Sequence, residues 1–260
     1  MNEIQLGDVT ITRVVEIDRS FYPTASMLPD STVDAVTRHY GWIRPHFFDE
    51  STGDIGSRIQ SYVVRTPGRA DTPGRTVIID TGVGNDKHRH ESPIWNMRRG
   101  TYLDDLAAVG VKPEDVDLVI ITHMHVDHVG WNTRLVEGTW VPTFPRATYL
   151  MVGEEWEFWR HERDRGGEAA VLIDDSVAPI VDAGRAKLVD AKHVIDEHLS
   201  FEPWPGHTPG HAAVRLQTSG GEAVFSGDLM HRVVQVAEPQ WNSRFCADGP
   251  RARASREAFV

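Results

Sequence analysis

Four side chains of the kinds that bind metal ions lie within six residues of one another: His123, His125, Asp127 and His128. They follow the apolar run 116–121, which is typical of a buried strand. Zinc and related divalent cations favour imidazole and carboxylate ligands. In an extended backbone His123 and His125 point to the same side, and a turn at Asp127 and His128 brings a second pair near. Burying several ionisable groups together is costly without a compensating partner, so the cluster predicts a metal site rather than a structural histidine.

Two remote stretches supply further candidates. His207 and His211 lie among the glycines and prolines of residues 205–211, where the turn is stiff and the backbone can approach closely. Asp228 follows the short apolar run 223–225. Each signal is weak alone, because an aspartate after a glycine is usually a turn residue, but the four-ligand cluster in the same chain raises the weight of both.

Strands and helices alternate along the chain and must position these residues. Runs of branched and apolar residues predict the strands. The helices are predicted from a capping box at Thr101, from the aromatic stripe of Trp156 and Trp159, and from the helical pattern of residues 250–260. We interpret the two tryptophans as core packing. The order predicts an α/β layered fold. The expected strands are 9–17, 59–65, 76–80, 116–121, 186–189, 211–217 and 223–225, and the expected helices are 101–110, 153–164 and 250–260.

Length and composition exclude several classes of protein. The 260 residues are 40% hydrophobic and 25% charged, which is ordinary for a globular domain and argues against disorder. A single cysteine, Cys246, cannot form an intramolecular disulfide, and nothing near it in the sequence indicates a catalytic thiol. We find neither a signal peptide nor an apolar run of membrane length, so a cytoplasmic protein without a membrane partner is expected. The net charge of −11 argues against a nucleic-acid partner.

The ordered motifs resemble those of the metallo-β-lactamase superfamily. The resemblance rests on Asp80, the cluster at 123–128, His207 and Asp228, which occur in the family's order along nearly the whole chain. It implies a four-layer αββα sandwich with a two-metal site between the sheets. We therefore expect residues 1–260 to form one domain of this type, lacking the C-terminal strand and helix that carry the family's last ligand.

The resemblance also implies a role for each site residue. His123, His125 and His207 would hold the first metal, Asp127 and His128 the second, and Asp228 would bridge both. Asp80 would fix the ligand loop by hydrogen bonds. The final family ligand, a histidine on a later strand, is absent, because the only histidine after Asp228 is His231, three residues on. The cofactors expected are two divalent ions, zinc first, with manganese, iron or cobalt as alternatives.

A two-metal site of this kind makes a metal-bound hydroxide available near neutral pH. The expected function is therefore hydrolysis of a small lactone, ester or phosphotriester of apolar or aromatic character, with Asp127 orienting the nucleophile or passing a proton. The runs 125–132 and 227–231 are similar to the branch with lactonases and methyl-parathion-type hydrolases. Signalling-lactone hydrolases usually carry tyrosine where this chain has His231, which brings it nearer to the parathion-hydrolase-like members. His231 is expected either to contact substrate or to tie down the loop of Asp228.

Two alternatives remain open at this point: a mononuclear iron dioxygenase-like member of the same fold, and a non-catalytic metal-binding protein. Many relatives form dimers, so the resemblance also allows a homodimer. Lys87 and Arg89, with the neighbouring His88 and His90, are interpreted as a solvated polar loop rather than a second metal site. Five side chains are expected to line an apolar substrate pocket: Phe47, Phe48, Trp95, Met124 and Trp131.

Overall fold

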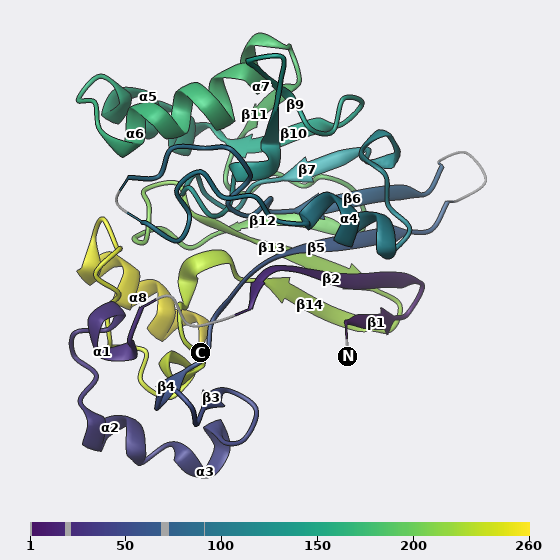
Figure 1. Ribbon diagram of the computed structural model, residues 1–260. Coiled ribbons are helices and arrows are strands. Elements are labelled where there is room, and N and C mark those ends of the chain that lie inside the picture. Colours follow the sequence, from purple (N-terminus) through teal and green to yellow (C-terminus); the bar gives the residue numbers. More distant parts are fainter. Residues whose placement is uncertain (1, 19–21, 69–72, 91) are drawn as a thin grey trace.

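Two β-sheets stack face to face in the computed structural model, which describes residues 2–18, 22–68, 73–90 and 92–260 (Figure 1). The large sheet has seven strands in the order β1-β2-β5-β6-β7-β10-β11. Its strands β1, β2, β5 and β6 pair antiparallel, whereas β6, β7, β10 and β11 run parallel. The bounds are β1 (Glu3–Leu6), β2 (Val9–Asp18), β5 (Arg58–Thr66), β6 (Arg75–Ile79), β7 (Leu118–Ile120), β10 (Thr148–Val152) and β11 (Ala186–Val189).

The second sheet is antiparallel and has the order β12-β13-β14. Two short hairpins complete the strands described, β3 with β4 and β8 with β9. The bounds are β12 (Leu199–Pro203), β13 (Ala212–Thr218), β14 (Gly221–Phe225), β3 (Phe48–Asp49), β4 (Asp54–Ile55), β8 (Thr133–Val136) and β9 (Thr139–Pro142).

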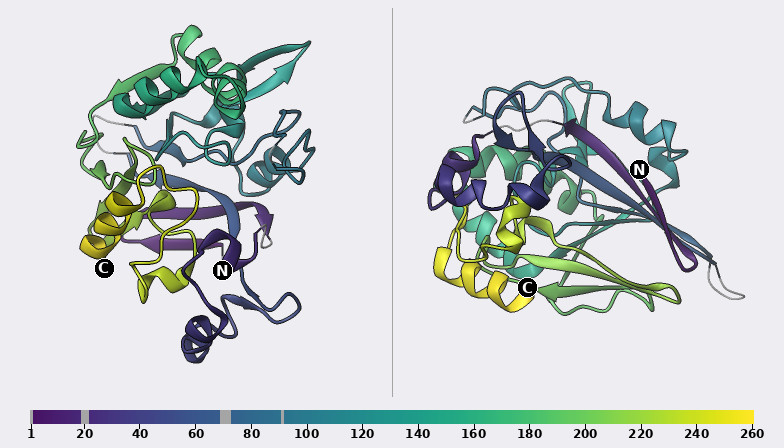
Figure 2. Two further views of the ribbon diagram at one scale, coloured as in Figure 1. Left: turned by 90° about the vertical axis from the view of Figure 1, so that its left-hand side faces the viewer. Right: turned by 90° about the horizontal axis from the view of Figure 1, so that it is seen from below.

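Helices cover the face of the large sheet that points away from the small one, and α8 lies beside the small sheet (Figure 1, Figure 2). The short helices α1 to α3 and the β3–β4 hairpin form a separate lobe, which packs on Val234 and Trp241. None of the described helices has the length and apolar composition needed to cross a bilayer. The bounds are α1 (Thr24–Met27), α2 (Val33–Thr37), α3 (Tyr40–Ile43), α4 (Tyr102–Ala108), α5 (Gly153–Arg163), α6 (Glu168–Leu172), α7 (Ala178–Asp182) and α8 (Gly249–Phe259).

Two apolar cores hold the layers together. Val77, Ile79, Val214 and Phe225 belong to the core between the two sheets. The other core lies between the large sheet and its helices and includes Tyr102, Leu106, Leu172 and Ile180. The central strands are buried on both faces, which explains their continuous apolar sequences.

The predicted elements are found close to their expected bounds. The predicted strand 116–121 is shorter, because only Leu118–Ile120 is paired as β7. The capping box expected at Thr101 is wrong: its side chain makes no cap hydrogen bond and instead donates to Asp105 Oδ2. Trp156 and Trp159 do pack against the helical core, as predicted, although both are only partly buried.

Candidate metal centre

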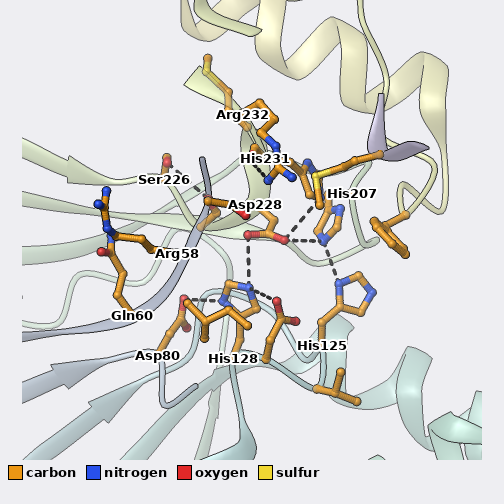
Figure 3. A pocket seen from close by; sticks show the side chains of 18 of the residues that line it. Arg58, Gln60, Asp80, His125, His128, His207, Ser226, Asp228, His231 and Arg232 are labelled. Carbon is orange, nitrogen blue, oxygen red and sulfur yellow. Dashed lines mark hydrogen bonds and ion pairs between the residues drawn. The ribbon is translucent and has the colours of Figure 1, made fainter. Parts of the chain in front are cut away.

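The candidate ligands come from loops that leave the two sheets at one edge (Figure 3). Ile79 of β6 pairs with Ile120 of the parallel strand β7. The residues that follow, Asp80 and the loop 121–128, therefore emerge side by side. Asp228 follows β14, and His207 lies in the connection between β12 and β13. Sheet stacking thus brings together groups about 150 residues apart in the sequence.

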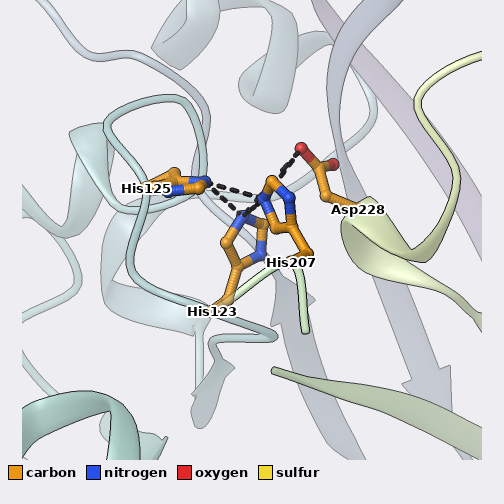
Figure 4. Close-up of side chains that lie close together, drawn as sticks. All are labelled: His123, His125, His207 and Asp228. Carbon is orange, nitrogen blue, oxygen red and sulfur yellow. Dashed lines mark hydrogen bonds and ion pairs between the residues drawn. The ribbon is translucent and has the colours of Figure 1, made fainter. Parts of the chain in front are cut away.

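Three histidine nitrogens meet at the centre of this edge (Figure 4). His123 Nε2 lies 3.1 Å from His125 Nδ1 and 3.1 Å from His207 Nε2, and the last two atoms are 2.8 Å apart. Asp228 Oδ2 lies 3.5 Å from His207 Nε2 and 3.9 Å from His123 Nε2. These four residues form one group with its ligand atoms within 4.8 Å of one another.

The donor set fits a divalent cation. Burial lowers the pKa of His125 to about 3 and holds the pKa of His123 and of His207 well below the usual range, so these rings are neutral. A neutral imidazole carries one N–H, so three nitrogens that meet pairwise cannot all be satisfied by hydrogen bonds among themselves. Around a tetrahedral zinc, nitrogens at 2.0–2.1 Å from the metal lie about 3.3 Å apart, close to the spacing found here.

A second group adjoins the first and consists of Asp127, His128 and Asp228. His128 Nε2 lies 3.2 Å from Asp228 Oδ1 and 3.9 Å from Asp127 Oδ2. Burial alone would lower the pKa of His128, but the surrounding carboxylates outweigh it and hold that pKa well above the usual range. Burial raises the pKa of Asp127 to about 6, against the opposing influence of His128. Asp228 belongs to both groups, which is the geometry required of a bridging ligand.

Asp80 organises this second group without belonging to it. Its Oδ2 lies 2.8 Å from His128 Nδ1, so His128 presents Nε2 toward Asp228. Its Oδ1 accepts from the Thr122 backbone N–H at 2.9 Å, and Oδ2 also accepts from the Thr122 hydroxyl. The position itself has a φ of +54°, which non-glycine residues rarely adopt. This geometry agrees with the hydrogen-bonding role expected for Asp80.

Glu155 on α5 links two ligand loops and was not identified from the sequence. Its Oε2 accepts from the backbone N–H of Met124, between His123 and His125, at 2.9 Å, and Oε1 accepts from the Gly210 N–H at 2.9 Å. Trp159 Nε1 also donates to Oε2, at 3.0 Å. The side chain is 1% exposed, and burial raises its pKa. In sequence its only signal is a charged residue in the first turn of a helix, which is usually a surface position.

Two further residues contact the histidine cluster. His211 is not among the grouped ligands of the described chain; its Nδ1 bonds to the Trp204 carbonyl, and its Nε2 accepts from the Asp228 N–H at 3.1 Å. The fold also brings Cys246 Sγ to 3.8 Å from His207 Nδ1, a proximity that the sequence does not reveal.

A cavity of about 680 Å³ opens onto the metal-binding groups. Phe47 and Trp95, which were expected at a substrate pocket, line this cavity. His231 also lines it, with Nε2 at 3.3 Å from Asp228 Oδ2, and both ring nitrogens are buried without a hydrogen-bond partner among the described residues. The wall also includes Tyr22, Trp159, Met230 and Phe245.

Three of the expected pocket residues are instead part of the core. Phe48 packs inside the N-terminal lobe, and Met124 and Trp131 belong to the core beneath the large sheet. Met124 alternates with His123 and His125, so its side chain points to the opposite side of the loop. Trp131 donates its Nε1–H to the buried carboxylate of Glu16 at 2.8 Å.

The interpretation of residues 87–90 as a solvated loop is wrong for Lys87 and Arg89. Both side chains are 0% exposed and bind the carboxylate of Asp175, at 3.4 Å from Lys87 Nζ and 2.8 Å from Arg89 Nη1. His88 and His90 are exposed and stack on each other, as expected of surface residues. Alternation along an extended segment sends one pair inward and the other outward.

Comparisons with known proteins agree with the fold. A model of the metallo-beta-lactamase superfamily matches residues 55–257. A ribonuclease from Thermus thermophilus is 27% identical over 181 residues, which cover 63% of this chain and 34% of that protein. An N-acyl homoserine lactonase from a Bacillus species is 22% identical over 163 residues, or 57% of this chain and 56% of the lactonase. The chain thus spans about half the length, or less, of these curated relatives.

Solved structures match nearly the whole chain. The hydrolase AbOPH of the beta-lactamase superfamily superposes with a TM-score of 0.75 at 24% identity, covering 99% of this chain and 84% of that one. AidC, a dizinc quorum-quenching lactonase, superposes with a TM-score of 0.70 at 22% identity and the same coverage. At this identity the likeness shows the fold alone. The predicted metallo-β-lactamase fold is confirmed.

Proposed function

The chain belongs to the metallo-β-lactamase superfamily of metal-dependent hydrolases, and from that premise we propose that it hydrolyses small lactones, esters or phosphotriesters of apolar or aromatic character. The structural neighbour AidC is a dizinc lactonase. The observation that carries the proposal is the triangle of neutral histidine nitrogens, which opens onto a cavity walled by aromatic side chains. Such a cavity takes up apolar ligands and aligns them with a few polar groups.

The ligand assignment follows the two groups. His123, His125 and His207 would hold one ion, Asp127 and His128 the other, and Asp228 both; zinc is the ion that this imidazole-rich set favours. When bound, such a pair of cations supplies an activated water near neutral pH and polarises a carbonyl or phosphoryl oxygen.

Two side chains of the cavity would orient the water, transfer the proton and bind the substrate. Asp127 lines the cavity and would orient the attacking water and hold the proton that the water gives up. The water oxygen bonds to the acyl or phosphoryl centre, the bond to the leaving oxygen breaks, and that oxygen takes up the proton. His231, with its nitrogens unsatisfied at the cavity wall, would donate a hydrogen bond to the substrate's carbonyl or phosphoryl oxygen.

Small-molecule substrates are proposed because of the size of the cavity and the lactonase relatives. The ribonuclease match covers only a third of that relative and does not favour RNA for a chain with a net charge of −11.

A substrate panel tests the proposal. Protein loaded with zinc, manganese or cobalt is assayed on γ- and δ-lactones, aryl esters, aryl phosphotriesters and a short RNA, and its metal content is measured. We expect turnover of at least one ester-type class, lost on chelation and in the double variant His123→Ala/His125→Ala, which should also bind less metal. A matched control is His88→Ala/His90→Ala, because these exposed histidines lie outside the site. Cleavage of RNA alone, oxygen consumption with one iron per chain, or no turnover at full metal occupancy would each overturn the proposal.

A further inference from the structure

The cavity carries positive charge that the metal-binding groups do not use. Apart from Asp80, Asp127 and Asp228, the lining of the cavity includes one carboxylate, that of Glu168. The cations of the lining are four arginines, Arg13, Arg58, Arg232 and Arg244.

Arg13 has no carboxylate partner among the described residues, unlike Arg58. Its Nη2 donates to the neutral amide oxygen of Asn2 at 3.0 Å, and its Nε is buried with no hydrogen-bond partner in the part of the chain that the structure describes. Arg58, by contrast, is paired with Asp18 at 2.8 Å. A half-buried cation with an unsatisfied N–H is costly in free energy, and an anion bound beside it would offset that cost.

Tyr62 and Gln60 complete a polar arm of the cavity with Arg13. Arg13 of β2 pairs in register with Tyr62 of β5, and Gln60 lies two residues before Tyr62, so all three share one face of the sheet. Gln60 Nε2 donates to Tyr62 Oη at 2.5 Å, which leaves the tyrosine hydrogen for another acceptor. Burial raises the pKa of Tyr62, so this hydroxyl stays protonated and able to donate. The arm therefore offers one cation and two N–H or O–H donors.

The arm and the metal-binding groups are connected through neighbouring strands of the large sheet. Tyr62 pairs with Ile79 of β6, which immediately precedes Asp80, and Asp80 contacts His128. Arg13 is therefore two strands away from β6, or about 10 Å at the usual strand spacing. Figure 3 shows Gln60 and Arg58 on one side of the metal-binding groups, with Ser226 between them and Asp228.

We propose that the polar arm binds an anionic group of the substrate, so that the preferred substrates are esters or lactones that carry a carboxylate at the end of the chain remote from the bond that is hydrolysed. This inference rests on the proposed hydrolase function and narrows its substrate class. The net charge of −11 repels anions in general, so a preference for an acidic substrate requires a local site of this kind.

Two matched esters test the inference. The 4-nitrophenyl monoester of octanedioic acid carries a carboxylate at the end of its chain, and 4-nitrophenyl nonanoate is an uncharged analogue of similar length. With zinc-loaded protein we expect kcat/KM to favour the acidic ester, mainly through KM. Arg13→Gln should lower kcat/KM for the acidic ester about tenfold to hundredfold, the usual loss for a charge-assisted hydrogen bond, and leave the neutral ester within about twofold. Arg13→Lys should recover part of the loss, and Arg146→Ala, an exposed position on another loop, should change neither.

A binding measurement separates this inference from the hydrolase proposal. The monoamide of octanedioic acid is titrated calorimetrically into metal-free protein, where we expect weak, salt-sensitive binding that is lost in Arg13→Gln. Absence of turnover on both esters, with this binding intact, would count against the hydrolase function and leave the anion site standing. Equal turnover of the two esters by the unmodified protein, or an equal loss on both in Arg13→Gln, would overturn the anion site.

Discussion

Replacing Glu155 tests whether one buried carboxylate fixes the loop of His123 and His125 relative to the loop of His207. In Glu155→Gln the side chain keeps its shape, but its NH2 end must face either the Met124 N–H or the Gly210 N–H, so one of these two hydrogen bonds is lost and two donors oppose each other. A hydrogen bond to a charged group contributes about 1.5–3 kcal/mol, so this variant should lose about 2–3 kcal/mol of stability. Glu155→Ala leaves three donors, including Trp159 Nε1, without their acceptor, and this variant should lose about 4–5 kcal/mol of stability.

The assays follow from these losses. For a chain of this size 1 kcal/mol corresponds to about 2 °C in Tm, so thermal unfolding of the metal-free proteins should show decreases of about 5 °C and about 9 °C. Because Met124 lies between His123 and His125, metal affinity measured by chelator competition should also fall, about tenfold to hundredfold. Glu154→Gln, at the neighbouring exposed position, is the control. Unchanged metal affinity in a folded Glu155→Ala protein would refute the reasoning, because the loops would then keep their geometry without the carboxylate.

Two further predictions concern groups outside the ligand set. Asp80→Asn places an NH2 group against Thr122 or His128, so it should weaken binding of the second metal about tenfold to hundredfold while the first stays bound; equal loss of both metals in a metal titration would contradict this. Burial lowers the pKa of Lys87 from 10.5 to about 7, against the opposing influence of Asp175. The unfolded chain therefore binds more protons than the folded one between these values, and stability should rise with pH across that window. Lys87→Met should remove this rise. If the free energy of urea unfolding depends on pH in the same way in the variant and in the unmodified protein, this prediction is refuted.

The four ordered motifs sufficed to predict the fold through their resemblance to the metallo-β-lactamase superfamily, and three of them, those at Asp80, 123–128 and Asp228, also end or follow apolar runs typical of strands. The structure brings Asp80, His207 and Asp228, which the resemblance implied as site residues, to one edge of the sheets beside the two metal-binding groups. Such inferences succeed because strand ends and loop ligands are encoded by neighbouring residues.

The sequence by itself determined which residue types stand at the strand ends and, through the family resemblance, predicted a candidate metal site there. Only the tertiary structure decided which distant side chains support that site. Glu155 and Lys87 look like surface charges in sequence, yet they are buried because partners on remote elements satisfy them. Met124 and Trp131 look like pocket residues, yet strand alternation and the packing of Trp131 on Glu16 turn them into the core. The inward or outward direction of a loop side chain depends on how layers stack, which no local pattern specifies.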